Sequence, residues 1–72
     1  MLIKYKDEVI NLDNVVRFSR YIATEEGCDL FSVKFYGPFG WWYIAFESEE
    51  DRDKAMNHIL NCYQWQREIC TL

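Results

Sequence analysis

The sequence predicts an α+β fold in a single domain, residues 1–72. We expect a four- to five-stranded, curved antiparallel sheet (a meander) with one C-terminal helix packed on one face. Residues 1–46 contain short runs rich in β-branched and aromatic residues, separated by turn formers. Residues 48–63 instead show the apolar spacing of an amphipathic helix. A chain of 72 residues is near the lower limit for folding without disulfides or metals.

The first strands are short. Residues 2–6 alternate apolar and lysine side chains, as a strand with one solvated face does. A turn at residues 7–8 leads to a second short strand at 9–12, and Asp13-Asn14 can bend the chain after it. Residues 15–24 then predict a long strand.

An aromatic hairpin follows in the middle of the chain. Residues 30–43 hold seven of the thirteen aromatic side chains. Strands at 30–36 and 41–46 meet at Gly37-Pro38-Phe39-Gly40, where Pro38 suits the second position of a four-residue turn. This turn places Phe39 at an exposed tip.

The helix is expected to begin after Ser48, which can cap the free amides together with Asp51. Acidic residues in the first turn also complement the positive end of the helix dipole. The stripe expected to face the sheet is Ala55, Met56, Ile59, Leu60 and Tyr63. Residues 65–72 either continue the helix on a rotated face or form a tail that docks elsewhere.

The alternation of side chains sorts the sheet into two faces, provided that no bulge interrupts the strands. The most apolar set should lie beneath the helix: Val16, Phe18, Ile22, Phe31, Val33, Phe35, Trp42, Ile44 and Phe46. Arg20 falls in this set as well. Because a charged side chain is unexpected on this side, we predict either a bulge near Ser19 or a position for Arg20 beyond the reach of the helix.

The opposite face is aromatic and mildly basic. Tyr, Trp and Arg are the residue types enriched where protein surfaces bind partners. We therefore predict a partner-binding surface made of Arg17, Tyr21, Lys34, Tyr36, Phe39, Trp41 and Tyr43. The alternative is that Met1–Leu12 or Trp65–Leu72 folds across this face.

Charge and cysteine content limit the function classes. The net charge of −4 argues against a general nucleic-acid binder, which needs clustered positive charge. The three cysteines are widely spaced, and the N-terminus becomes charged at Lys4, unlike a secretory leader. No apolar run approaches the length of a membrane span. We expect a cytoplasmic protein with reduced thiols and no membrane association.

No catalytic, cofactor or metal site is expected. His58 and Cys62 are four residues apart and can share a helical face, but a metal needs two further ligands. The remaining candidates are Cys28, Cys70 and nearby acids. A surface His58 and a small buried Cys62 are therefore favoured. His58 is the only histidine, and the sequence shows no residue that would orient it for catalysis with a serine or cysteine.

These observations predict a small non-catalytic protein-interaction module whose aromatic sheet face binds a protein partner or a second copy of the chain, with a homodimer favoured. A compact acidic chain of this length also suits a phage or mobile-element protein that binds and blocks a host factor. The alternative function is single-stranded nucleic-acid binding. Tyr36, Trp41 and Tyr43 would then stack on bases, while basic side chains such as Arg17 and Lys34 meet phosphates.

Overall fold

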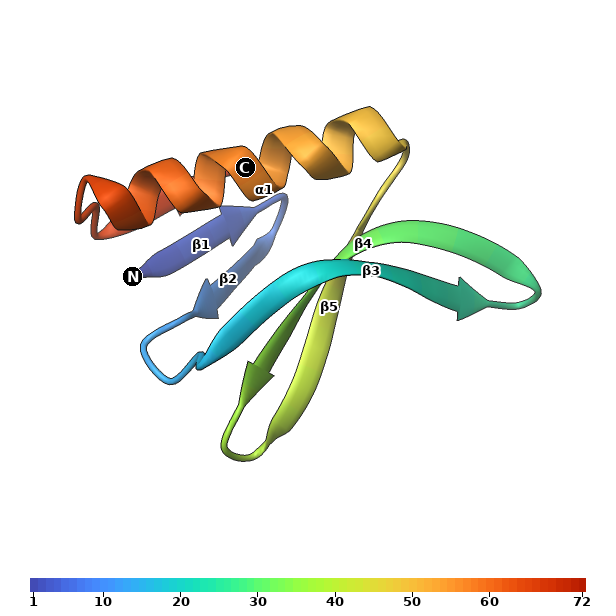
Figure 1. Cartoon of the computed structure of the whole chain (residues 1–72), viewed down its shortest axis with the longest axis horizontal. Coiled ribbons are helices and arrows are strands. Elements are labelled where there is room, and N and C mark those ends of the chain that lie inside the picture. The colour runs from blue at the N-terminus through green and yellow to red at the C-terminus, as the bar shows by residue number, and fades with distance from the viewer.

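A computed structural model describes all 72 residues and shows an α+β fold with six strands and one helix (Figure 1). The elements are β1 (Leu2–Tyr5), β2 (Glu8–Asn11), β3 (Arg17–Glu25), β4 (Cys28–Gly37), β5 (Gly40–Phe46), α1 (Glu49–Gln64) and β6 (Ile69–Thr71). The predicted α+β class and single long helix are confirmed. No helix in the structure is both long and apolar enough to cross a membrane.

The strands form two three-stranded sheets, in the orders β2-β1-β6 and β3-β4-β5, where one curved meander was expected. The chain leaves the first sheet through the turn around Asp13-Asn14, so β2 does not pair with β3. The last residues form a docked tail, because β6 pairs in parallel with β1 after the helix has ended. The sequence predicted α1 as the final element, but β6 follows it.

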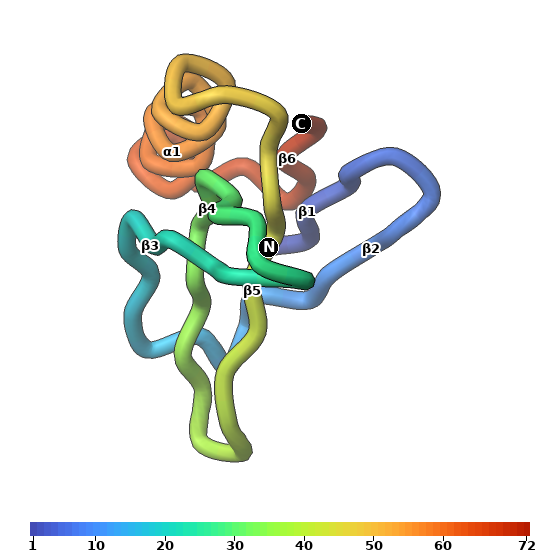
Figure 2. The backbone as a smooth tube through the Cα atoms, turned by 90° about the vertical axis from the view of Figure 1, so that its right-hand side faces the viewer, coloured from blue at the N-terminus to red at the C-terminus, as the bar shows by residue number.

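The core lies between α1 and both sheets. Figure 1 shows α1 above strands β1 to β5, and Figures 1 and 2 both show the β4–β5 turn at the end of the molecule opposite the helix. The core cluster draws on every layer: Ile3, Leu12, Val33, Phe35, Ile44, Ile59, Cys62 and Cys70. Phe18, Trp42 and Phe46 pack against it, as their strand positions predicted. Val16 and Ile22 do not follow this prediction, since they are 78% and 47% exposed.

The start of α1 follows the sequence signals. The Ser48 hydroxyl accepts a hydrogen bond from the Asp51 amide at 3.1 Å, and three acidic residues occupy the first turn. This local geometry confirms the predicted cap and explains the acidic run as the beginning of a helix.

The buried stripe of α1 is rotated from the predicted one. The buried residues are Arg52, Ala55, Ile59 and Cys62, while Leu60 and Tyr63 are 51% and 40% exposed. The rotation has a clear cause. Strand β6 places Cys70 against Cys62 in the core, so a second sheet that the sequence did not reveal shares the helix with the first.

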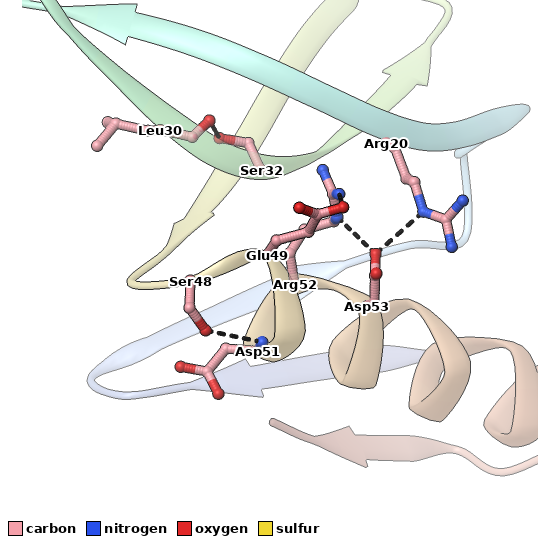
Figure 3. A network of polar contacts seen from close by, with 8 residues as sticks. All are labelled: Arg20, Leu30, Ser32, Ser48, Glu49, Asp51, Arg52 and Asp53. Atoms are coloured by element: carbon pink, nitrogen blue, oxygen red, sulfur yellow. Dashed lines mark hydrogen bonds and ion pairs between the residues drawn. The ribbon is translucent and has the colours of Figure 1, made fainter.

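Arg20 lies beneath the helix without a bulge, because β3 and β4 stay in register from Arg17 to Glu25. Its guanidinium Nε donates to the Asp53 carboxylate at 3.0 Å (Figure 3). Arg52 donates to the same oxygen at 2.8 Å, and its guanidinium lies 5.6 Å from the centre of the Phe31 ring. Both predictions for Arg20 were therefore wrong: this ion pair ties α1 to the sheet.

This network makes stability depend on pH. The hydrogen bond from Arg52 lowers the pKa of Asp53 despite desolvation, and the charge of Arg20 lowers the pKa further. A depressed folded-state pKa stabilises the fold above the unfolded pKa and loses this effect as pH falls through the folded pKa. We expect acid to weaken the wild type more than Asp53→Asn as the pH falls below 3.8. Urea unfolding at a series of pH values measures this. The same dependence of the unfolding free energy on pH in both proteins would contradict it.

Candidate functional site: the aromatic face of the β3-β4-β5 sheet

The unbroken register of the three strands builds the candidate site. Arg17 pairs with Tyr36, Tyr36 pairs with Trp41, and Lys34 pairs with Tyr43. Because alternate residues point to opposite faces, these side chains and Tyr21 share the face turned away from α1. We call this surface the aromatic face. It brings together six of the seven residues predicted from the sequence, all except Phe39.

Lys34 occupies the centre of the aromatic face. Its ammonium nitrogen lies 4.0 Å from the centre of the Trp41 ring, 4.4 Å from that of Tyr21 and 4.9 Å from that of Tyr36. A cation within about 6 Å of a ring centre is attracted by the negative face of the ring. Three rings thus surround the Lys34 ammonium group. These contacts restrain the lysine side chain and order the rings around it.

The remaining members extend this cluster on both sides. The Arg17 guanidinium lies 4.0 Å from the centre of the Tyr36 ring. On the other side, the Tyr43 ring is 6.3 Å from Trp41 and 6.0 Å from Tyr21 between centres. The cluster is therefore continuous from Arg17 to Tyr43.

The β3–β4 hairpin bends toward the aromatic face. Glu25 is six residues beyond Ser19, the β3 residue that lies in register with Lys34. Lys34 in turn pairs with Tyr43 on β5. A flat sheet would therefore hold Glu25 about 20 Å away from the row that contains Tyr43. The Tyr43 hydroxyl nevertheless donates a hydrogen bond to the Glu25 carboxylate. Figure 1 shows the corresponding bend in β3 and β4.

Small side chains on the inside of the bend make the curl possible. Ala23 and Ser32 are 2% and 0% exposed, and Ser32 pairs with Ala45 on β5. The Ser32 hydroxyl donates to the Leu30 carbonyl at 3.0 Å, so its polar atom has a partner (Figure 3). Larger side chains at these positions would force the two arms of the bent sheet apart.

The hydroxyls of two face tyrosines have perturbed pKa values. Burial raises the pKa of Tyr36, but hydrogen bonds with Ser19 and Lys34 and nearby positive charges outweigh it, so the net pKa is lowered. The hydrogen bond with Glu25 is the main cause of the raised pKa of Tyr43, and desolvation adds to it. The aromatic face thus has a positive end near Arg17 and a negative end near Glu25.

Exposure differs across the predicted residues. Trp41 is 53% exposed, whereas Tyr21, Lys34, Tyr36 and Tyr43 are half-buried. Phe39 is 99% exposed in the β4–β5 turn and takes no part in the cluster.

Neither chain terminus takes up a position across the aromatic face. Ile3 and Cys70, from β1 and β6, belong to the core cluster on the helix side of the sheet. The alternative in which Met1–Leu12 or Trp65–Leu72 covers the aromatic rings is therefore wrong.

Two features escaped the sequence analysis. Glu25 reaches the aromatic face only because the sheet curls, and no local pattern around it signals that bend. Cys70 lies close to His58 and Cys62 because β6 returns to β1, and its spacing from them in sequence has no recognised meaning.

No family model, curated protein or solved structure matches this chain. A functional assignment therefore rests on the chemistry of the aromatic face.

Proposed function

We propose that the protein is a small non-catalytic interaction module that forms a homodimer through its aromatic face. One observation carries the proposal: four rings and two cations share a surface that α1 does not cover, with Trp41 half exposed at its edge. The helix and the other sheet pack on the opposite side, so the rings are free to meet a second copy.

The composition of the face supports binding. Binding energy at protein interfaces concentrates in Trp, Tyr and Arg side chains, which bury large areas and keep a polar group. Here the rings are already ordered around Lys34. Ordering before association lowers the conformational entropy lost on binding, so more of the contact energy appears as affinity.

The charge pattern favours a second copy as the partner. A two-fold interface places the same surface on both subunits, so the surface must complement itself. Arg17 and Lys34 give the aromatic face positive charge, and Glu25 gives it negative charge at the other end. A two-fold axis through the face can bring opposite ends together.

The size of the core gives a reason to associate. Only 12 of the 72 residues are buried. The accessible surface is 5245 Å², whereas a compact monomer of 8.8 kDa exposes about 4,800 Å². Dimers of standard size bury about 800 Å² per partner. Burying that much surface in a dimer would bring the chain below the surface area of a compact monomer.

Truncation of Trp41 is expected to weaken the dimer by about 30-fold or more, since a hot-spot side chain contributes at least about 2 kcal/mol. Light scattering coupled to size exclusion, across a dilution series, measures the mass of the wild type and Trp41→Ala. Trp65→Ala is the matched control, because Trp65 is 70% exposed and lies outside the face.

Two outcomes would count against this function. A wild type that stays monomeric at high concentration would contradict self-association. Equal weakening by Trp41→Ala and Trp65→Ala would mean that association does not use the aromatic face. Thermal unfolding of each variant, measured in parallel, separates a lost interface from a lost fold.

Single-stranded nucleic-acid binding is the second candidate, favoured by the contact of Arg17 and Lys34 with rings on one face. Bases would stack on exposed rings while the cations meet phosphates. Titration with a labelled oligonucleotide at low salt distinguishes it. Quenching of tryptophan fluorescence that is absent in Trp41→Ala supports this candidate, and no quenching at high micromolar concentration excludes it.

A further inference from the structure

A cluster of three metal-ligating side chains lies far from the aromatic face, between α1 and β6. His58 and Cys62 are one turn apart on the helix, and Cys70 comes from the final strand. One ligand atom from each residue lies within 4.8 Å of the other two. The sequence alone placed only two ligands together, and the return of β6 to β1 supplies the third.

The distances suit a zinc ion. Zn–S and Zn–N bonds of about 2.3 and 2.0 Å place tetrahedral ligand atoms about 3.6–3.8 Å apart. The separations of 4.8 Å or less differ from this spacing by about 1 Å at most. Two thiolates and one imidazole are also a ligand set that Zn²⁺ accepts, with water completing the fourth position.

An open pocket lies beside the exposed ligand of the cluster. Cys62 and Cys70 are buried, but His58 is exposed and lines an open pocket together with Thr71 and Leu72. Neither cysteine lines this pocket, so an ion would enter past the His58 side chain.

The two cysteines also have a purely structural explanation as small core residues. Cys62 and Cys70 are both buried in the core cluster, and their sulfur atoms lie within 4.8 Å of each other. A bound Zn²⁺ supplies the positive charge that thiolates need in a buried place, and the ion displaces the two protons.

We propose that His58, Cys62 and Cys70 bind one Zn²⁺ ion that joins the C-terminal strand to the helix. Binding exchanges the two thiol protons for the ion, so two protons leave for each Zn²⁺ bound. The ion joins β6 to α1 across the core at Cys62 and Cys70. Small domains with few buried residues often rely on such a metal for stability.

The test uses the full chain, reduced and freed of metal with a chelator. Co²⁺ serves as the probe, because thiolate ligands give it a charge-transfer band and tetrahedral sites give it strong visible bands. We expect both bands at one equivalent, displacement of Co²⁺ by Zn²⁺, and a higher melting temperature with Zn²⁺ than without it.

Variants assign the ligands. His58→Ala should weaken Zn²⁺ binding by more than about 100-fold, since outer-shell partners alone contribute about 10–100-fold. His58 is exposed, so this variant should fold even if Cys70→Ser does not. Cys28→Ser is the matched control, because Cys28 is an exposed thiol outside the cluster.

Four results would overturn the proposal. One is Co²⁺ binding without a thiolate band. Another is unchanged Zn²⁺ affinity in His58→Ala, and a third is loss of binding in Cys28→Ser. A wild type that takes up no metal under reducing conditions would likewise leave Cys62 and Cys70 as core thiols only.

Discussion

Phe35→Ala is expected to leave most of the protein unfolded at room temperature. Phe35 is 0% exposed and lies in the central strand, in register with Phe18 and Trp42. Its ring centre is 6.1 Å from that of Phe18 and 5.7 Å from that of Trp42, so truncation removes the middle of an aromatic row. Phe-to-Ala changes in cores cost about 3–5 kcal/mol. Cores of this size supply about 3–5 kcal/mol in total.

Phe39→Ala is the matched control for that substitution. It removes the same side chain from a position that is 99% exposed in the β4–β5 turn, so stability should change by no more than about 0.5 kcal/mol. Circular dichroism with urea unfolding compares the two variants. Similar unfolding midpoints for Phe35→Ala and Phe39→Ala would contradict the core described above.

Ile59→Ala is expected to destabilise the fold by about 2–5 kcal/mol. Ile59 is 0% exposed and is the central helix residue of the core cluster, where α1 meets both sheets. Its neighbour Leu60 is 51% exposed. The expected loss of stability comes from the cavity that the substitution leaves among Ile3, Val33 and the other core residues. The sheets on both sides of this cavity prevent it from collapsing.

Leu60→Ala provides the comparison, since it removes a side chain of equal size from the next residue. We expect a cost well below that of Ile59→Ala, with unchanged helix content. Urea unfolding followed by far-ultraviolet circular dichroism measures both. Equal costs would mean that the helix faces the core with the stripe predicted from sequence, which contains both residues.

Local patterns predicted most of the β3-β4-β5 sheet. Alternation placed Phe35 and Trp42 on the core side and Tyr36 and Trp41 on the other, because no bulge disturbs the register. Turn formers and the cap at Ser48 predicted where the hairpin turns and the helix begins. These features depend on neighbours in sequence, which single-sequence patterns describe well.

Long-range pairing was not predictable in the same way. The three residues of β6 carry too little periodicity to indicate a strand, and their pairing with β1 spans almost the whole chain. That pairing divides the strands into two sheets, rotates the buried stripe of α1 toward Cys62 and brings Cys70 to it. Arg20 was misjudged for a related reason, because its partner Asp53 is 33 residues away.

The candidate site was half predictable. The alternation of side chains along the strands placed six of its residues on one face. The cluster around Lys34 and the contact of Tyr43 with Glu25 follow instead from the bend of the sheet. That bend depends on small side chains at Ala23, Ser32 and Ala45, which have no clear meaning in sequence alone. Phe39 was correctly placed at an exposed tip, although it lies apart from the cluster.

Concentration-dependent NMR of the uniformly ¹⁵N-labelled chain tests the aromatic face most directly. The three tryptophans give three indole N–H signals: Trp41 on the face, Trp65 exposed elsewhere, and Trp42, whose indole nitrogen is buried without a hydrogen-bond partner. As the concentration rises, the Trp41 signal should shift together with the amides of Tyr21, Lys34 and Tyr43. Shifts confined to Trp65 or to the exposed side of α1, or no shifts at all, would contradict the proposed interface.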